Sequence, residues 1–195
     1  SLLTKIVAGF LVLGAIGLFW HQRLRKLNAE LVRLAQTDTL TGLYNRTHID
    51  TLLRQEFDRA RRYDRKLSVI ILDVDHFKRV NDKLGHLAGD RLLVALAGVL
   101  RGALRSTESL GRWGGEEFLV LCPETGQAEA LLAAERLCLA VRGHDFGGGR
   151  TQTVSAGVAV LKPDDTTDSL LQRADSALYE AKRSGRDRAC QGESE

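Results

Sequence analysis

The sequence predicts an α/β (α+β) sandwich in which helices flank one mostly antiparallel sheet, and three observations lead to it. Residues Leu67–Leu72 form an apolar, β-branched run without polar alternation, which is typical of a strand buried on both faces. Gly114-Gly115-Glu116-Glu117, followed by an apolar run to Cys122, predicts a hairpin turn that leads into a second buried strand. Segments with helical periodicity separate these runs. The predicted order is helix, strand, helix, helix, strand, strand, helix, strand, helix.

Each element follows from its own pattern, and turn residues at 37–46 precede the first of them. The predicted helices cover Thr47–Arg62, a segment from Phe77 that Gly85–Asp90 interrupts and Leu92–Leu104 resumes, Ala128–Val141 and Ser169–Arg183. The last of the four predicted strands covers Thr151–Val160, and residues 191–195 are expected to form a frayed tail.

Length and charge exclude several classes of protein. The 195 residues have room for one sizeable domain plus an appendage. With 28 basic and 25 acidic residues the net charge is only +3, which is too balanced for general binding of DNA or RNA, so any nucleotide ligand should be small. The three cysteines lack paired spacing, which favours free thiols in a reducing compartment over a disulfide framework or a zinc site.

The first residues are predicted to end a transmembrane helix. No charge interrupts Ile6–Trp20, and together with Leu2 and Leu3 this span approaches the roughly 20 residues that cross a bilayer, although Lys5 lies within it. Trp20 and the basic residues of His21–Lys26 fit an interfacial anchor and a cytoplasmic flank. We therefore expect residues 1–21 in the inner (cytoplasmic) membrane, with the rest of the chain facing the cytoplasm. The alternative is a buried or partner-facing helix; a signal peptide is disfavoured because no small-residue cleavage site follows.

Residues 22–37 are predicted to be a signalling linker. Leucines recur at steps of three and four, as in the seam of a short coiled coil: Leu24, Leu27, Leu31 and Leu34. Such a seam would pair two chains, so we expect a homodimer. Because the sequence begins at Ser1 and has no methionine, we also expect a sensor upstream.

Three carboxylates lie at predicted strand ends. Glu116 and Glu117 are adjacent in the hairpin and repel each other unless a cation or a donor lies between them. Asp73 follows the first buried strand. A hard metal ion that also binds a phosphate would neutralise these three carboxylates. The alternatives are an exposed hairpin with two solvated glutamates and an aspartate that caps the next helix.

Over residues 37–188 the sequence resembles the diguanylate cyclase (GGDEF) family. The resemblance rests on five blocks that match in order and spacing: Asp38-x-Leu40-Thr41-x-Leu43-x-Asn45-Arg46, Asp73-Val74-Asp75-His76-Phe77-Lys78 with Asn81-Asp82, Gly85-His86 with Gly89-Asp90, Gly114-Gly115-Glu116-Glu117-Phe118, and Tyr179-x-Ala181-Lys182-x-x-Gly185-Arg186. It implies a palm-like nucleotidyl cyclase fold at residues 38–190. The implied reaction condenses two GTP molecules into cyclic di-GMP and two pyrophosphates across a dimer.

The resemblance also implies the catalytic and metal-binding residues. Asp73, Glu116 and the main-chain carbonyl of Val74 would hold Mg²⁺ (or Mn²⁺), because oxygen atoms are the ligands that this ion prefers. Glu117 would be indispensable for turnover, either by holding a second metal or by helping to activate the attacking hydroxyl. His76 and His86 are interpreted as packing or hydrogen-bonding residues, with a histidine base as the alternative.

Substrate contacts are implied at eight positions. Lys78, Lys182 and Arg186 would bind phosphate oxygens, with Lys182 and Arg186 four apart on or near one helix face; for this pair, a solvated helix end is the alternative. Asn81 and Asp90 would select guanine, because their side chains match its hydrogen-bonding edge. Phe77, Gly114 and Gly115 complete the set, and the two glycines would admit the phosphates by lacking side chains.

The sequence departs from the family at a further motif, outside the five matched blocks. Many members carry an Arg-x-x-Asp motif for product inhibition, and this chain has Arg105 and Glu108 at those positions, so feedback by cyclic di-GMP is in doubt there. The hairpin also carries Glu116 where the family name has aspartate, a change compatible with metal binding. Two rival functions stay open: a catalytically weak receptor for GTP or cyclic di-GMP, and an enzyme that makes a different cyclic nucleotide.

Overall fold

The computed structural model describes residues 14, 16–25, 31, 36–147 and 151–192. The chain forms two compact units, Ser1–Thr37 and Asp38–Glu195. In the first unit, residues 16–25 are helical and expose the side chains of Leu18, Phe19, Trp20 and Leu24. Within the described ranges no helix is long and apolar enough to cross a membrane. Of the four seam leucines, Leu24 and Leu31 are exposed, and Leu27 and Leu34 lie outside the described residues.

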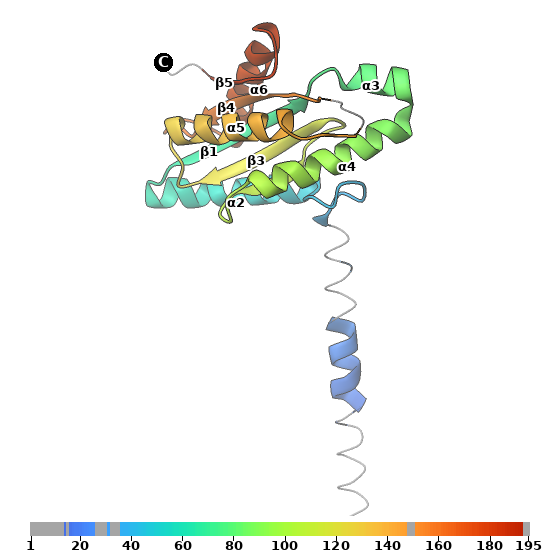
Figure 1. The fold of residues 1–195 in the computed structure, drawn as a ribbon. Helices are drawn as coiled ribbons and strands as arrows, with labels where there is room; N and C mark the ends of the chain where they lie inside the picture. The colour runs from blue at the N-terminus through green and yellow to red at the C-terminus, as the bar shows by residue number, and fades with distance from the viewer. Residues whose placement is uncertain (1–13, 15, 26–30, 32–35, 148–150, 193–195) are drawn as a thin grey trace, which may run out of the picture. The chain divides into compact units, whose positions relative to one another are not determined.

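The second unit is built on a five-stranded sheet in the order β2-β3-β1-β4-β5 (Figure 1). The strands are β1 (Leu67–Val74), β2 (Ser109–Arg112), β3 (Glu117–Pro123), β4 (Val154–Val160) and β5 (Ala189–Gln191). β1 lies between β3 and β4 and is antiparallel to both, and β2 is antiparallel to β3. Only β5 among the described strands is parallel to its neighbour. The predicted mostly antiparallel sheet is therefore confirmed.

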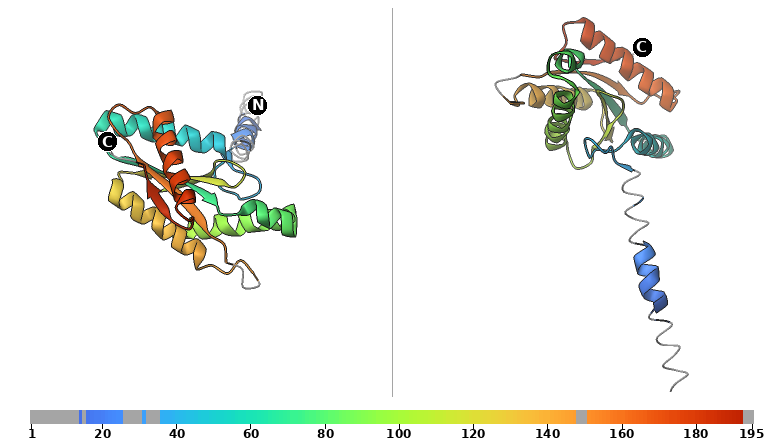
Figure 2. Two further views of the ribbon diagram at one scale, coloured as in Figure 1. Left: turned by 90° about the horizontal axis from the view of Figure 1, so that it is seen from above. Right: turned by 90° about the vertical axis from the view of Figure 1, so that its right-hand side faces the viewer.

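Helices cover both faces of this sheet, as the view from above shows (Figure 2). They are α2 (Arg46–Tyr63), α3 (Phe77–Leu84), α4 (His86–Ala103), α5 (Gln127–Arg142) and α6 (Thr167–Arg183). Alternate residues of β1 face opposite sides: Val69 and Ile71 pack with residues of α2 and α6, whereas Ile70 and Leu72 pack with residues of α4 and α5. This two-sided burial explains why β1 reads as an unbroken apolar run.

The structure corrects the prediction at several places. β5 was not expected, and Gln191, the expected start of a frayed tail, pairs with Val158. Gly85 alone separates α3 from α4, so the predicted interruption up to Asp90 is wrong: its φ of +80° suits glycine, and the helix resumes at His86. β4 begins three residues later than predicted, at Val154.

Candidate active site

The sheet register brings two of the predicted carboxylates together. Asp73 near the end of β1 is paired directly with Glu117 at the start of β3, so their side chains lie on the same face of the sheet. The Val74 N–H donates to the Glu116 carbonyl at 3.2 Å, which fixes the hairpin against β1. Residues 44 positions apart in the sequence thus form one acidic group at this end of the sheet.

The acidic group is held close to one lysine. Lys182 Nζ lies 2.9 Å from Asp73 Oδ2, and the Asp73 side chain is only 10% exposed. Burial, followed by the charge of Asp73, raises the pKa of both Glu116 and Glu117 above the ordinary value, and Lys182 opposes the rise. Burial also raises the pKa of Asp73, against the charge of Lys182. The positive charge near Asp73, Glu116 and Glu117 is therefore too small to balance the negative charge of the three carboxylates.

A hard divalent ion fits this donor set. Carboxylate oxygens are its preferred ligands, and Mg²⁺ is usually held by one or two carboxylates together with substrate phosphates. Within the described part of the chain, no three acidic, histidine or cysteine side chains are arranged closely enough to hold a metal by themselves.

The two hairpin glycines have different roles. A Cβ at Gly114 would lie 2.5 Å from Glu117 Oε2, so the missing side chain gives room to that carboxylate, whereas nothing lies within 4 Å of such an atom at Gly115. Neither glycine has a positive φ. The turn therefore does not need glycine for its backbone conformation, and at Gly114 the missing side chain leaves room for Glu117.

The residues predicted to contact the base lie on α3 and α4. Asn81 Oδ1 is buried and has no hydrogen-bond partner, and it lies where a Cβ on Gly89 would be only 2.0 Å away. Asp90 is exposed within α4 and does not cap it. Lys78 is exposed on α3, whereas Phe77 is buried in the core beneath Gly89. An unpaired buried acceptor at Asn81 leaves a hydrogen bond for a ligand to supply.

Arg186 does not share a helix face with Lys182. α6 ends at Arg183, and Arg186 follows in a left-handed conformation with φ of 62°. Its charge still lowers the pKa of Asp73. The structure thus keeps both cations near the acidic group but places them on different elements.

The residues of the possible inhibition site lie in the turn between α4 and β2. The Glu108 side chain is only 2% exposed, and its Oε2 accepts a hydrogen bond from the Arg105 N–H at 2.7 Å. Arg136 of α5 donates to the same carboxylate at 3.2 Å. A ligand that needs Glu108 must therefore compete with Arg136.

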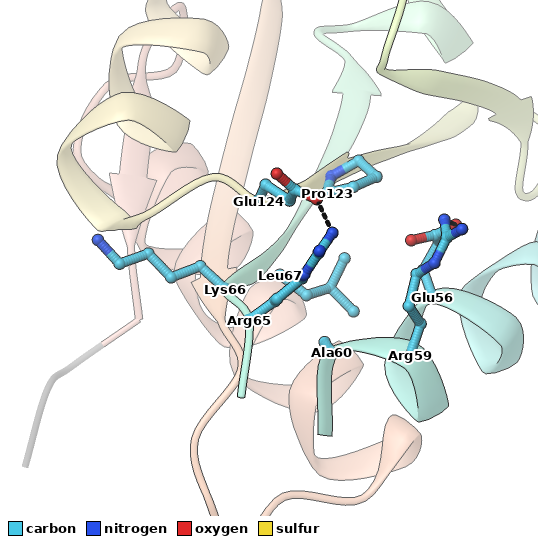
Figure 3. Close-up of a pocket in the computed structure, with 8 residues that line it drawn as sticks. All are labelled: Glu56, Arg59, Ala60, Arg65, Lys66, Leu67, Pro123 and Glu124. Atoms are coloured by element: carbon cyan, nitrogen blue, oxygen red, sulfur yellow. Dashed lines mark hydrogen bonds and ion pairs between the residues drawn. The ribbon is translucent and has the colours of Figure 1, made fainter. Parts of the chain in front are cut away.

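A small pocket lies at the opposite end of the sheet (Figure 3). Leu67 and Pro123, which are paired at the far ends of β1 and β3, line it, and Arg65 points toward Glu124 across it. Its volume of about 30 Å³ has room for water molecules only and is far too small for a nucleotide.

Arg112 connects the hairpin at Gly114–Glu117 to the turn that begins the second unit. Its guanidinium donates to both carboxylate oxygens of Asp38 at 3.2 Å and to the Gly115 carbonyl at 2.7 Å. Arg101 of α4 also holds this turn, because it donates to the Gly42 carbonyl at 2.9 Å. The position of the hairpin is thus tied to Asp38–Gly42, the segment with which the second unit begins.

The Asp38 contacts predict a pH-dependent contribution to stability. Burial by itself would raise the pKa of Asp38, but hydrogen bonds from Thr41 and the charge of Arg112 lower it below the ordinary value. The unfolded chain then binds the proton more tightly, so the contribution is complete well above about pH 4 and is lost as the pH falls through the lowered pKa. We expect Asp38→Asn to be less stable than the native chain at about pH 7, with a smaller difference at about pH 3. Urea denaturation at both values measures this difference, and a difference independent of pH would contradict the assignment.

Sequence reasoning missed three residues around the acidic group. The charges of Arg46 in α2 and Asp175 in α6 act on the pKa of Glu117 in opposite directions, and the Arg46 guanidinium lies over the Trp113 ring at 4.7 Å. No local pattern could connect these helices with the hairpin. The third residue is Asp75, which, like Arg46, stood in a matched block but received no role.

Asp75 joins three segments beneath the site. It is only 2% exposed and accepts hydrogen bonds from Ser155 Oγ at 2.7 Å, Thr153 Oγ1 at 2.7 Å and the Asp187 N–H at 3.1 Å. Asp187 and Arg186 are successive left-handed residues. Asp75 therefore fixes the backbone that carries Arg186.

Replacing Asp75 should weaken the fold. Asp75→Ala leaves two hydroxyls and the Asp187 backbone N–H without their acceptor, and we expect it to lower the free energy of unfolding by about 2 kcal/mol or more. Asp75→Asn keeps one carbonyl oxygen and should lose less. Urea denaturation is the measurement, with exposed Asp58→Ala on α2 as the control. Equal stability of Asp75→Ala and Asp58→Ala would refute the role.

Comparison with known proteins agrees with this geometry. Residues 35–188 match the family described as "Diguanylate cyclase, GGDEF domain". Diguanylate cyclase DgcP of Pseudomonas aeruginosa is 45% identical over 157 residues, which are 79% of this chain and 23% of that protein. Probable diguanylate cyclase DgcC of Escherichia coli K12 is 40% identical over 158 residues, or 80% of this chain and 43% of that protein. The chain thus spans less than half the length of either relative.

A solved structure shows the same fold. The crystal structure of the coiled coil and GGDEF domain of DgcB from Caulobacter crescentus, in complex with c-di-GMP, has a TM-score of 0.84 at 31% identity and covers 91% of this chain and 96% of that one. The family match extends over most of the chain and includes β1 to β4, whereas β5 begins one residue beyond its end. The chain therefore belongs to the diguanylate cyclase, GGDEF domain, family.

Proposed function

We propose that this chain condenses two molecules of GTP into cyclic di-GMP with release of two pyrophosphates. The observation that carries the proposal is the pairing of Asp73 with Glu117 beside Lys182 at one end of the sheet. In each of the two steps a 3′-hydroxyl oxygen forms a bond to an α-phosphorus, the bond from that phosphorus to pyrophosphate breaks, and the hydroxyl proton leaves. The site must therefore accept a proton and stabilise negative charge on phosphate oxygens.

The chain's own groups suit both tasks. Burial makes the Glu117 carboxylate a better proton acceptor than a solvated glutamate, in keeping with its raised pKa. Lys182, Arg186 and Lys78 are the cations available for phosphate oxygens. Mg²⁺ or Mn²⁺ would be held by Asp73, Glu116 and the Val74 carbonyl, and when bound it would neutralise the triphosphate and lower the pKa of the hydroxyl. A second ion held by Glu117 is the alternative to its role as proton acceptor.

Guanine specificity would come from α3 and α4. Guanine presents N–H donors, and Asn81 Oδ1 is a buried acceptor without a partner. The exposed Asp90 carboxylate on α4 is a second acceptor. Adenine lacks this pattern of donors and would leave Asn81 unsatisfied, a loss that gives strong discrimination between bases.

We propose that the active form is a homodimer, because one domain holds one GTP and each 3′-hydroxyl must reach the other nucleotide. The exposed Leu24 and Leu31 of the first unit support pairing through the linker. Control by an upstream sensor and anchoring in the inner membrane, with the domain facing the cytoplasm, are parts of the same proposal. Exposed Leu18, Phe19 and Trp20 support the anchoring, which cell fractionation would test.

The experiment is incubation of the purified chain with Mg²⁺ and either GTP or ATP over a range of protein concentrations, with the products separated by chromatography. We expect cyclic di-GMP from GTP, no cyclic product from ATP, and a rate that rises faster than linearly with protein concentration. A different cyclic product would identify another nucleotide cyclase.

The second candidate function is a receptor module for GTP or cyclic di-GMP. The bound c-di-GMP in the DgcB structure supports recognition of this ligand by the fold. GTP binding without any product at all protein concentrations would favour the receptor. Product inhibition through Arg105 and Glu108 stays a prediction, and Arg136→Ala should change it because Arg136 now pairs with Glu108.

A further inference from the structure

Lys182 forms an ion pair with Asp73, the carboxylate that a metal ion would need. Its ammonium lies 2.9 Å from Asp73 Oδ2, and the lysine side chain is 32% exposed while that of Asp73 is 10% exposed. A divalent ion bound to Asp73 would sit a few ångströms from this ammonium, and two cations so close in a partly buried site repel each other strongly. Metal and lysine therefore compete for the same group.

The electrostatics of the neighbouring groups have the same origin. Asp73, Glu116 and Glu117 each feel the positive charge of Lys182, while Arg186 acts on Asp73 and Arg46 on Glu117. Burial and mutual repulsion leave the three acids with a need for a cation. In the absence of any other ligand the lysine meets this need.

The lysine also has an alternative partner. It lies in the last turn of α6, and its flexible four-carbon stem allows the ammonium to move without the backbone. If GTP binds as proposed above, its triphosphate offers several oxygens to the same ammonium. The guanidinium of Arg112, by contrast, is fixed by Asp38 and the Gly115 carbonyl and cannot exchange in this way.

We propose that Lys182 is a placeholder cation, which neutralises Asp73 in the nucleotide-free protein and moves to the triphosphate when GTP binds. This inference rests on the proposed function. Asp73 then becomes available to a divalent ion only when a triphosphate has drawn the lysine away. Metal and nucleotide bind together, and the nucleotide-free protein has low affinity for the metal.

The test is Mn²⁺ binding to the nucleotide-free chain, measured from the electron paramagnetic resonance signal of free Mn²⁺. We expect weak binding by the native chain and binding about tenfold tighter, or more, by Lys182→Met, which removes the charge and keeps most of the side chain. Arg183→Met is the matched control, because Arg183 lies on the same turn but pairs with exposed Glu180. Adding Asp73→Asn to Lys182→Met should abolish the gain, because it removes the carboxylate that Lys182 releases.

Thermal unfolding gives a second measurement and shows that the variants fold. Lys182→Met leaves a buried carboxylate unpaired, so we expect a lower Tm than that of the native chain without metal and recovery when Mn²⁺ is added. Lys182→Gln should show the same lower Tm and the same recovery as Lys182→Met. Equal Mn²⁺ affinity of the native chain and both Lys182 variants would overturn the inference, as would tight binding by the native chain without nucleotide. Neither assay needs turnover, so a failure of the proposed catalysis would be seen separately.

Discussion

Glu117→Gln is expected to abolish the formation of cyclic di-GMP without weakening the fold. Glutamine keeps the shape of the side chain but cannot accept a proton, and a positioned proton acceptor contributes a factor of about 10²–10⁴ to a rate. Because Glu117 lies opposite Asp73 in the sheet, the substitution also removes a repulsion between like charges. Loss of activity should therefore accompany an unchanged or higher Tm.

Glu124→Gln provides the matched control. Glu124 follows the other end of β3 and forms an exposed ion pair with Arg65, so its loss should change stability by less than about 1 kcal/mol and leave activity unchanged. Initial rates by chromatography and thermal unfolding of both variants are the measurements. If Glu117→Gln retained a tenth or more of the native rate, Glu117 would not be the essential carboxylate.

Gly157→Ala is expected to produce the largest loss of stability. Gly157 lies in β4 beneath α6, and an added Cβ would be 2.1 Å from the Ala174 carbonyl oxygen and 2.2 Å from the Leu178 nitrogen. Both are backbone atoms of the helix, so the clash cannot be relieved by a change of rotamer. We expect the free energy of unfolding to fall by about 3 kcal/mol or more.

The same substitution at Gly98 should have the opposite effect. Gly98 is exposed in α4, and nothing lies within 4 Å of an added Cβ, so alanine should stabilise the helix by about 0.5–1 kcal/mol. Urea denaturation of both variants measures the contrast. A Gly157→Ala protein as stable as the native chain would show that α6 does not approach β4 this closely.

The elements that sequence reasoning found have local causes. β1 was predictable because both its faces are buried, and the five helices because each buries one stripe against the sheet. β5 was missed because three residues carry no periodicity; it forms where Ala189–Gln191 run beside β4 after α6. Gln191 was assigned to a tail for the same reason.

The candidate site divides in a similar way. The sequence alone determined the family, the acidic residues at the strand ends and the oxygen chemistry suited to a divalent ion, because motif and residue type are local properties. Only the tertiary structure decided that Asp73 faces Glu117, that Lys182 rather than Arg186 pairs with Asp73, that Glu108 is buried against Arg136, and that Asp75 holds the backbone of Arg186. These contacts join residues far apart in the chain, and their distances depend on strand register and on how closely helices pack against the sheet, neither of which a local sequence pattern specifies.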